Sequence, residues 1–175
     1  REYGLERFFD ADASVLDIGS NFGFFVCEFA LHCQLAHGIE PNPHLNQIGE
    51  ITAERLGVRD RVEFYDCLFD EFRPQITYNN VFSFAAFFTQ DGRERSDASN
   101  YFNKINQMLR PSGYVFYEST SYTKEPSSRN YSHFTAAESA VKAMAEVMTL
   151  EKTWETVSGS VGSFRRFAIS MKKEN

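Results

Sequence analysis

Residues 15–25 read Val-Leu-Asp-Ile-Gly-Ser-Asn-Phe-Gly-Phe-Phe, and this stretch indicates the fold. An apolar run carries Asp17 near its end, and a turn with two glycines, Gly19 and Gly23, leads into a helical pattern. Glycines at such a turn let the backbone approach a ligand closely. A dinucleotide site would require Gly-x-Gly-x-x-Gly, but Asn21 takes the place of the middle glycine. The Asp-x-Gly-x-x-x-Gly spacing therefore favours a nucleotide cofactor that lacks a pyrophosphate.

Around this stretch, short apolar runs alternate with helical patterns, which is typical of an α/β fold with a mostly parallel sheet. We predict five strands in the first two thirds of the chain, at Ser14–Ile18, Ala36–Glu40, Arg61–Tyr65, Asn80–Phe84 and Gly113–Glu118. We predict helices between them at Phe22–Cys33, Pro43–Leu56 and Asp97–Leu109.

The last third of the chain has a different pattern. Ser119–Ser132 is polar and is predicted to be a long loop, either a lid or a plain surface loop, before a helix at Ala136–Met148. Two strands follow, Leu150–Val157 and Phe164–Met171, joined by a Gly- and Ser-rich turn that predicts a hairpin. The last strand should therefore enter the sheet antiparallel. A chain of 175 residues fits one domain.

Composition excludes several classes of function. The net charge of −6, from 24 acidic and 18 basic residues, disfavours nucleic acid as a partner. Three cysteines, an odd number, argue against a disulfide framework and favour a cytoplasmic location. No run approaches the roughly 18 apolar residues of a membrane span, so we expect no membrane contact. The first residue, Arg1, is not Met, which suggests either a trimmed chain or a domain cut from a longer chain, whose additional domains would then be partners.

Two acidic residues follow the next two predicted strands. Glu40 lies 21 residues after Gly19, where a carboxylate can accept hydrogen bonds from both ribose hydroxyls of a nucleotide. Asp66 follows the third strand, where it would face an adenine amino group. Each has a simpler explanation when taken alone, Glu40 in a turn and Asp66 as the cap of a helical turn at Phe69–Glu71. Together, at this distance and in this order, they favour a nucleotide site.

With these residues the chain resembles the class I S-adenosylmethionine-dependent methyltransferases. The matching segments, in the family's order, are Asp17–Gly23, Gly38–Pro43, Asp66–Cys67 and Leu109–Val115. One departure is Ser112, which stands in a predicted loop where the family usually has Gly. The resemblance implies a Rossmann-like, seven-stranded, mostly parallel sheet with helices on both faces and an antiparallel last strand. It also implies S-adenosyl-L-methionine as the cofactor and S-adenosyl-L-homocysteine as its product.

The resemblance assigns roles to individual residues. Gly19 and Gly23 would shape the methionine pocket, and Asp17 would orient the amino-acid end of the cofactor. Glu40 would hold the ribose and Asp66 the adenine. The expected cofactor-binding residues are Asp17, Gly19, Ser20, Asn21, Gly23, Glu40, Pro41, Asp66, Cys67 and Phe84.

Methyl transfer from a sulfonium is a single displacement, so a base is needed only when the acceptor holds its proton at neutral pH. The candidates for this base are Glu118, at the end of the fifth strand, and His133, in the predicted loop, with Asp91 as a third choice. Simpler explanations exist for the first two, Glu118 as the partner of an arginine and His133 as a solvated loop residue. The other histidines lack the spacing of metal ligands, so we expect no metal.

The segments after the fourth and fifth strands would bind the methyl acceptor. The run Phe84–Phe87 lacks the Asp/Asn-Pro-Pro-aromatic pattern of enzymes that methylate exocyclic amines of bases, and no cysteine nucleophile lies near it. The sequence therefore favours an O- or N-methyltransferase for a small molecule or a glycan. A non-catalytic or regulatory domain of the same fold and an RNA methyltransferase remain as alternatives, and Asn21 disfavours an NAD-dependent oxidoreductase.

Overall fold

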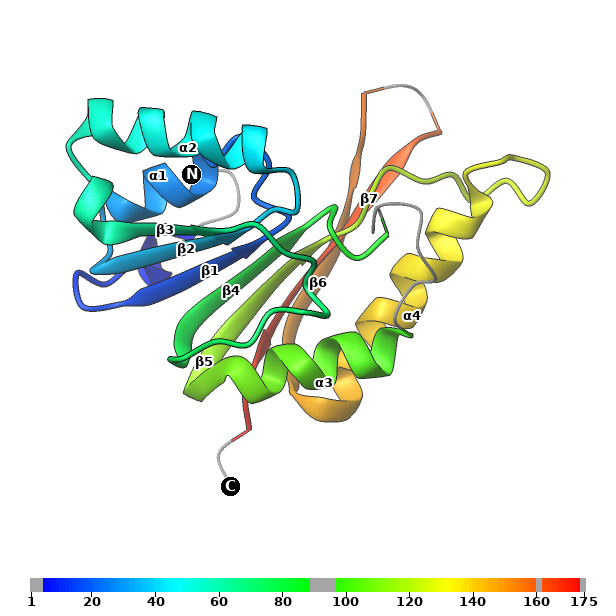
Figure 1. Cartoon of the computed structure of the whole chain (residues 1–175). Helices are drawn as coiled ribbons and strands as arrows, with labels where there is room; N and C mark the ends of the chain where they lie inside the picture. The colour runs from blue at the N-terminus through cyan, green and yellow to red at the C-terminus, as the bar shows by residue number, and fades with distance from the viewer. Residues whose placement is uncertain (1–4, 89–96, 160–161, 174–175) are drawn as a thin grey trace. The chain divides into compact units, whose positions relative to one another are not determined.

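The computed structural model of the chain describes residues 5–88, 97–159 and 162–173. The chain forms two compact units, residues 1–82 and 83–175 (Figure 1). Seven strands form one sheet in the order β3-β2-β1-β4-β5-β7-β6, and β4 (Tyr78–Phe84) belongs to both units. This is the predicted fold class, a mostly parallel seven-stranded sheet.

The strands of the first unit are parallel. β1 (Ser14–Ile18) lies between β2 (Leu35–Ile39) and β4, and β2 also pairs with β3 (Val62–Tyr65). Every residue of β1 is buried, as expected for a central parallel strand that reads as a continuous run. Parallel strands end at the same edge, so the residues that follow β1, β2 and β3 are neighbours there.

Two helices, α1 (Phe24–Ala30) and α2 (Pro43–Leu56), lie side by side on one face of these strands (Figure 1). Local sequence sets the ends of α2. The side chain of Asn42 accepts a hydrogen bond of 3.1 Å from the amide of His44, and Gly57 ends the helix at a φ of 71°. Short 3-10 helices at Leu5–Phe8 and Arg59–Arg61 complete the unit.

The ring of Phe64 fills space that three glycines leave open. A Cβ atom would lie 2.6 Å from this ring at Gly49, 2.7 Å at Gly23 and 2.9 Å at Gly38. Real side chains do not tolerate such distances, so a side chain at any of the three would displace the ring. Gly23 therefore has a packing role in addition to any role in a cofactor pocket.

The second unit contains the end of β4 and five further elements. The last strand, β7, pairs antiparallel with both β5 and β6, which confirms the predicted hairpin. In Figure 1, α3 and α4 lie beside one another in this unit. The elements are α3 (Ala98–Met108), β5 (Leu109–Glu118), α4 (Tyr131–Val147), β6 (Thr149–Val157) and β7 (Phe164–Met171).

Several predicted boundaries were wrong. The first helix was predicted from Phe22 but starts at Phe24, because Gly23 has a left-handed φ of 73° that ends the turn before it. The predicted loop at Leu109–Gly113 is the start of β5, and Ser112 takes a left-handed φ of 58° inside it. The last helix was predicted from Ala136 but starts five residues earlier, at Tyr131.

This last change affects a candidate base, since His133 lies in the first turn of α4 and not in a loop. The predicted loop at Ser119–Ser132 is also partly fixed. Tyr122 is buried and forms two backbone hydrogen bonds of 2.9 Å with Phe164, which extends the pairing of the strands. Asp91, the third candidate base, lies outside the described residues.

Within the described ranges, no helix is long and apolar enough to cross a membrane. Among the same residues, no three His, Cys, Asp or Glu side chains gather as a metal site would require.

Candidate functional site

The turn after β1 directs its amides into the protein. The amides of Gly19 and Ser20 donate to the carbonyl of Ile39 at 2.8 and 3.0 Å, and that of Asn21 donates to a carboxylate oxygen of Glu40 at 3.2 Å. Asn21 adopts a left-handed φ of 52°, which Asn tolerates better than most residues. A pyrophosphate-binding turn needs its amides for the phosphates. This turn has already used three of them, which argues against a dinucleotide.

Asp17 is buried at the end of β1, with 3% of its surface exposed. Burial disfavours the charged carboxylate and raises the pKa of Asp17 to about 8. A cation next to this side chain would restore the charged form. Asp17 therefore suits the ammonium group of an amino acid, the role that the resemblance implies.

Glu40 is held in place from both sides of its carboxylate. Oε2 accepts from the amide of Asn21, and Oε1 accepts from the amide of Asn42 at 3.0 Å. The side chain stays partly exposed, so each oxygen retains a lone pair for a further donor. The simpler explanation, Glu40 as a turn residue, is thus also correct, and the two roles are compatible.

Asp66 follows β3 and is exposed. Its Oδ1 accepts a hydrogen bond of 2.6 Å from the Nδ2 of Asn46, a residue of α2. The predicted helical cap is not present, since residues 69–71 form a turn and Glu71, not Asp66, accepts from the amide of Leu68 at 3.3 Å. Asp66 is therefore oriented by a buried side chain and presents its other oxygen to solvent.

The remaining predicted cofactor residues fall in two groups. Pro41 and Cys67 are partly exposed after β2 and β3. Ser20 is buried, and its hydroxyl oxygen has no hydrogen-bond partner in the described part of the chain. Phe84 lies in the second unit at the end of β4. The first unit thus brings together nine of the ten, namely Asp17, Gly19, Ser20, Asn21, Gly23, Glu40, Pro41, Asp66 and Cys67.

In the second unit, the ends of β4 and β5 are joined by a hydrogen bond of 2.8 Å from the amide of Ala85 to the carbonyl of Glu118. Ala85 has a left-handed φ of 58°, which is uncommon for alanine. The Glu118 carboxylate is nearly buried and forms an ion pair with Arg165 of β7. The explanation of Glu118 as the partner of an arginine is therefore supported.

His133 has a fixed orientation. Its Nδ1 lies 3.0 Å from the carbonyl oxygen of Ser121, and its ring centre lies 3.7 Å from that of Phe88. Because a carbonyl can only accept, Nδ1 carries the proton and Nε2 keeps a free lone pair. This is the arrangement of a positioned general base.

Sequence reasoning missed Asn46, Ser121 and Arg165. Asn46 stands on the buried face of α2 with Gly49 and Ala53, and a polar residue at this helical spacing was an overlooked signal. The Nε of Arg165 donates a hydrogen bond of 3.1 Å to the Oγ of Ser121. The two residues are 44 positions apart in the sequence, and no local pattern connects them.

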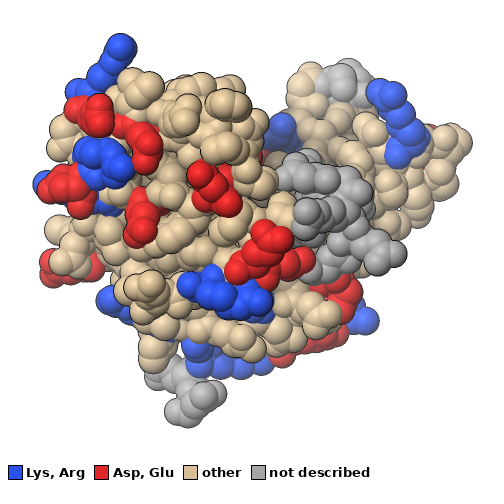
Figure 2. Space-filling model, viewed as in Figure 1, with Lys and Arg blue, Asp and Glu red and all other residues tan. Residues whose placement is uncertain are grey.

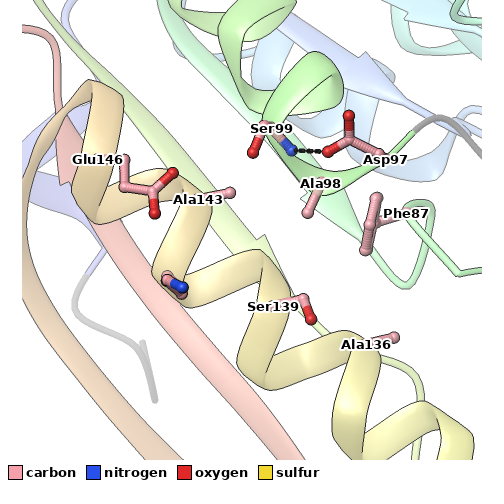
Figure 3. A pocket seen from close by; sticks show the side chains of 9 residues that line it. Phe87, Asp97, Ala98, Ser99, Ala136, Ser139, Ala143 and Glu146 are labelled. Carbon is pink, nitrogen blue, oxygen red and sulfur yellow. Dashed lines mark hydrogen bonds between the residues drawn. The ribbon is translucent and has the colours of Figure 1, made fainter.

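A cavity of about 460 Å³ lies between the start of α3 and the middle of α4 (Figure 3). Small side chains such as Ala136, Ser139 and Ala143 face it from α4. None of the predicted cofactor-binding residues lines this cavity, and neither Glu118 nor His133 does, but Phe87 lines it and belongs to the segment that was predicted to bind the acceptor.

Comparison with known proteins shows the fold. No protein-family model and no curated protein matches the chain. The chain nevertheless has the fold of the class I S-adenosylmethionine-dependent methyltransferases, as its resemblance to solved structures shows.

The N-methyltransferase NodS from Bradyrhizobium japonicum WM9 is similar over 99% of this chain and 95% of its own, with a TM-score of 0.78 and 17% identity. A methyltransferase from Geobacter sulfurreducens, crystallised with S-adenosyl-L-homocysteine, covers 98% and 89% with a TM-score of 0.72 and 14% identity. The StiE O-MT, residues 961–1257, covers 93% and 69% with a TM-score of 0.68 and 12% identity.

The residues present fit this cofactor. A sulfonium nucleoside with an amino-acid tail offers a cation for Asp17, which is buried and has no charged partner within residues 5–88, 97–159 and 162–173. Its ribose hydroxyls and adenine amino group are donors for the carboxylates of Glu40 and Asp66. It has no pyrophosphate, in accord with the amides already engaged at Gly19, Ser20 and Asn21.

Proposed function

We propose that the chain is an S-adenosyl-L-methionine-dependent methyltransferase that acts on an oxygen or nitrogen atom of a small molecule or a glycan. The observation that carries the proposal is the set of three carboxylates, Asp17, Glu40 and Asp66, at the ends of three adjacent parallel strands. Each matches a different donor or cation of the cofactor, whose sulfonium methyl is the electrophile.

The binding roles follow from the contacts. Glu40 would bind the ribose with a carboxylate that two backbone amides hold in place. Asp66 would bind the adenine, and Asp17 would become charged when the ammonium group arrives. Ser20, Asn21, Gly19 and Gly23 would line the approach to the methionine end.

We assign the general base to His133. Its Nε2 would take the proton of a hydroxyl or ammonium acceptor while the bond from Nδ1 to Ser121 keeps the ring oriented. Glu118 is the weaker candidate, because Arg165 already occupies one of its oxygens and a proton would have to displace that ion pair.

The acceptor class rests on indirect support. The similar structures include one called an N-methyltransferase and one called an O-MT, so both kinds of acceptor atom stay in the proposal. On the face seen in Figure 2, acidic and basic side chains are mixed and no extended basic patch is present among the described residues. With a net charge of −6, this favours a small molecule or glycan over RNA.

The test is a transfer assay with S-adenosyl-L-methionine and a panel of amines, phenols, alcohols and amino sugars, with formation of S-adenosyl-L-homocysteine as the readout. Turnover that depends on one acceptor class supports the proposal. Cofactor binding without turnover on any member, together with turnover on RNA, would replace it with the RNA alternative, and binding without turnover on either favours a non-catalytic domain.

A further inference from the structure

Asn46 is the polar member of the buried face of α2. The buried residues of this helix are Asn46, Gly49 and Ala53, and Asn46 is only 4% exposed. These positions are three and four residues apart, which is where an amphipathic helix places apolar side chains. An amide at such a position costs free energy unless it is hydrogen-bonded.

The amide of Asn46 connects the two loops that carry the nucleotide-binding carboxylates. Its Nδ2 donates to the backbone carbonyl of Glu40 at 2.8 Å and to the Oδ1 of Asp66 at 2.6 Å. Both hydrogens of the NH₂ group are therefore used, one for each loop. Its Oδ1 is buried and has no hydrogen-bond partner among the residues that the structure describes.

Because its Oδ1 is unpaired, the presence of Asn46 at this position is not explained by a gain in fold stability. An unsatisfied buried acceptor destabilises a fold, whereas an apolar side chain of similar size would not. Asp66 is exposed and could be solvated without Asn46. What Asn46 adds is a fixed orientation of one carboxylate and a fixed distance between the loops after β2 and β3.

We infer that Asn46 is a positioning residue that sets the geometry of the adenine- and ribose-binding carboxylates. The inference rests on the proposed function, since it assumes that Glu40 and Asp66 bind the nucleoside part of the cofactor. Preorganisation of this kind raises affinity, because less rotational freedom is lost on binding.

The experiment compares Asn46→Leu with Gln47→Leu, which places the same side chain at the next, exposed position of α2. Titration calorimetry measures binding of S-adenosyl-L-homocysteine and of 5′-methylthioadenosine, which lacks the amino-acid tail. We expect Asn46→Leu to weaken both ligands by the same factor, about tenfold, as for loss of one charge-assisted contact. Gln47→Leu should bind like the original chain.

A second pair of measurements separates positioning from a purely structural role. Thermal unfolding of Asn46→Leu without ligand should occur at the same or a higher temperature. In a chain that already carries Asp66→Ala, adding Asn46→Leu should have a smaller effect on binding, because the contact between Asn46 and Asp66 is already lost. A lower unfolding temperature with unchanged affinity, or full additivity of the two substitutions, would overturn the inference. If the original chain binds neither ligand, it is the proposed function that fails.

Discussion

The Nδ1 of His133 and the carbonyl oxygen of Ser121 lie 3.0 Å apart, a hydrogen bond that orients the imidazole. The hydroxyl of the same serine accepts from Arg165 at 3.1 Å, and Arg165 is paired with Glu118. Ser121 therefore contacts one candidate base, His133, and also the arginine that pairs with the other candidate, Glu118. Its contact with His133 involves only Nδ1, so Nε2 stays available to accept a proton. The carboxylate of Glu118, in contrast, is held in the ion pair with Arg165.

Replacement of His133 by Asn should lower kcat by about 100-fold or more, the usual contribution of a general base. The Asn amide can still donate to Ser121, so the fold and cofactor affinity should be retained. The measurement is the steady-state rate of the original chain and of the variant with an acceptor found in the panel. An unchanged kcat in the variant would remove His133 from the role of base.

Glu118→Gln is the matched comparison, because its amide oxygen can still accept from Arg165. We expect a smaller fall in kcat than for His133→Asn. If Glu118→Gln lowers kcat more than His133→Asn does, the roles of the two residues must be exchanged.

Asp17→Asn should stabilise the ligand-free chain. In the folded state the pKa of Asp17 is raised to about 8, while in the unfolded chain an Asp has a pKa of about 3.9. Between these values the unfolded state loses a proton that the folded state keeps, so stability falls as pH rises from about 4 to 8. The variant does not lose stability in this way. Its free energy of unfolding should therefore exceed that of the original chain by a margin that grows across this pH range to more than about 1 kcal/mol. Urea unfolding at several pH values measures it.

The same substitution should weaken S-adenosyl-L-homocysteine and leave 5′-methylthioadenosine unaffected, because only the former carries an ammonium group. Binding of the former to the original chain near neutral pH should also release a proton, visible as a dependence of the binding enthalpy on the buffer. An equal loss of affinity for both ligands would show that Asp17 does not contact the ammonium group and acts elsewhere in the site.

Glu40→Ala should weaken both ligands by about 1–3 kcal/mol, since both carry the ribose. Glu54→Ala, which removes an exposed carboxylate from α2, is the control and should bind normally. Unchanged affinity of Glu40→Ala in calorimetry would remove the ribose assignment.

Gly49→Ala should destabilise the fold although alanine favours helices by about 1 kcal/mol. The added methyl group would lie 2.6 Å from the ring of Phe64, and such crowding costs about 1–3 kcal/mol. Addition of Phe64→Leu should restore part of the loss, and Gln47→Ala on the exposed side should cause none. If Gly49→Ala is more stable than the original chain, the ring of Phe64 does not need the space beside Gly49.

Sequence patterns predicted elements with strong local signals. The bounds of α2 agree with the prediction because Asn42, Pro43 and Gly57 mark its ends, and those of β7 agree because a hairpin turn precedes an apolar run. The start of β5 was missed because a proline and a left-handed Ser112 look like a loop.

The candidate site divides in the same way. Asp17, Glu40 and Asp66 could be predicted because parallel strands end at one edge, so sequence order gives spatial order. The contacts of Ser121 with His133 and Arg165 could not, since they depend on how α4 and β7 pack.

The measurement that tests the central claim most directly is calorimetric titration of the chain with S-adenosyl-L-methionine, S-adenosyl-L-homocysteine and NAD. Our account predicts that the first two bind at micromolar concentration and that NAD does not. Binding of NAD in preference to both, or binding of none of the three, would contradict it.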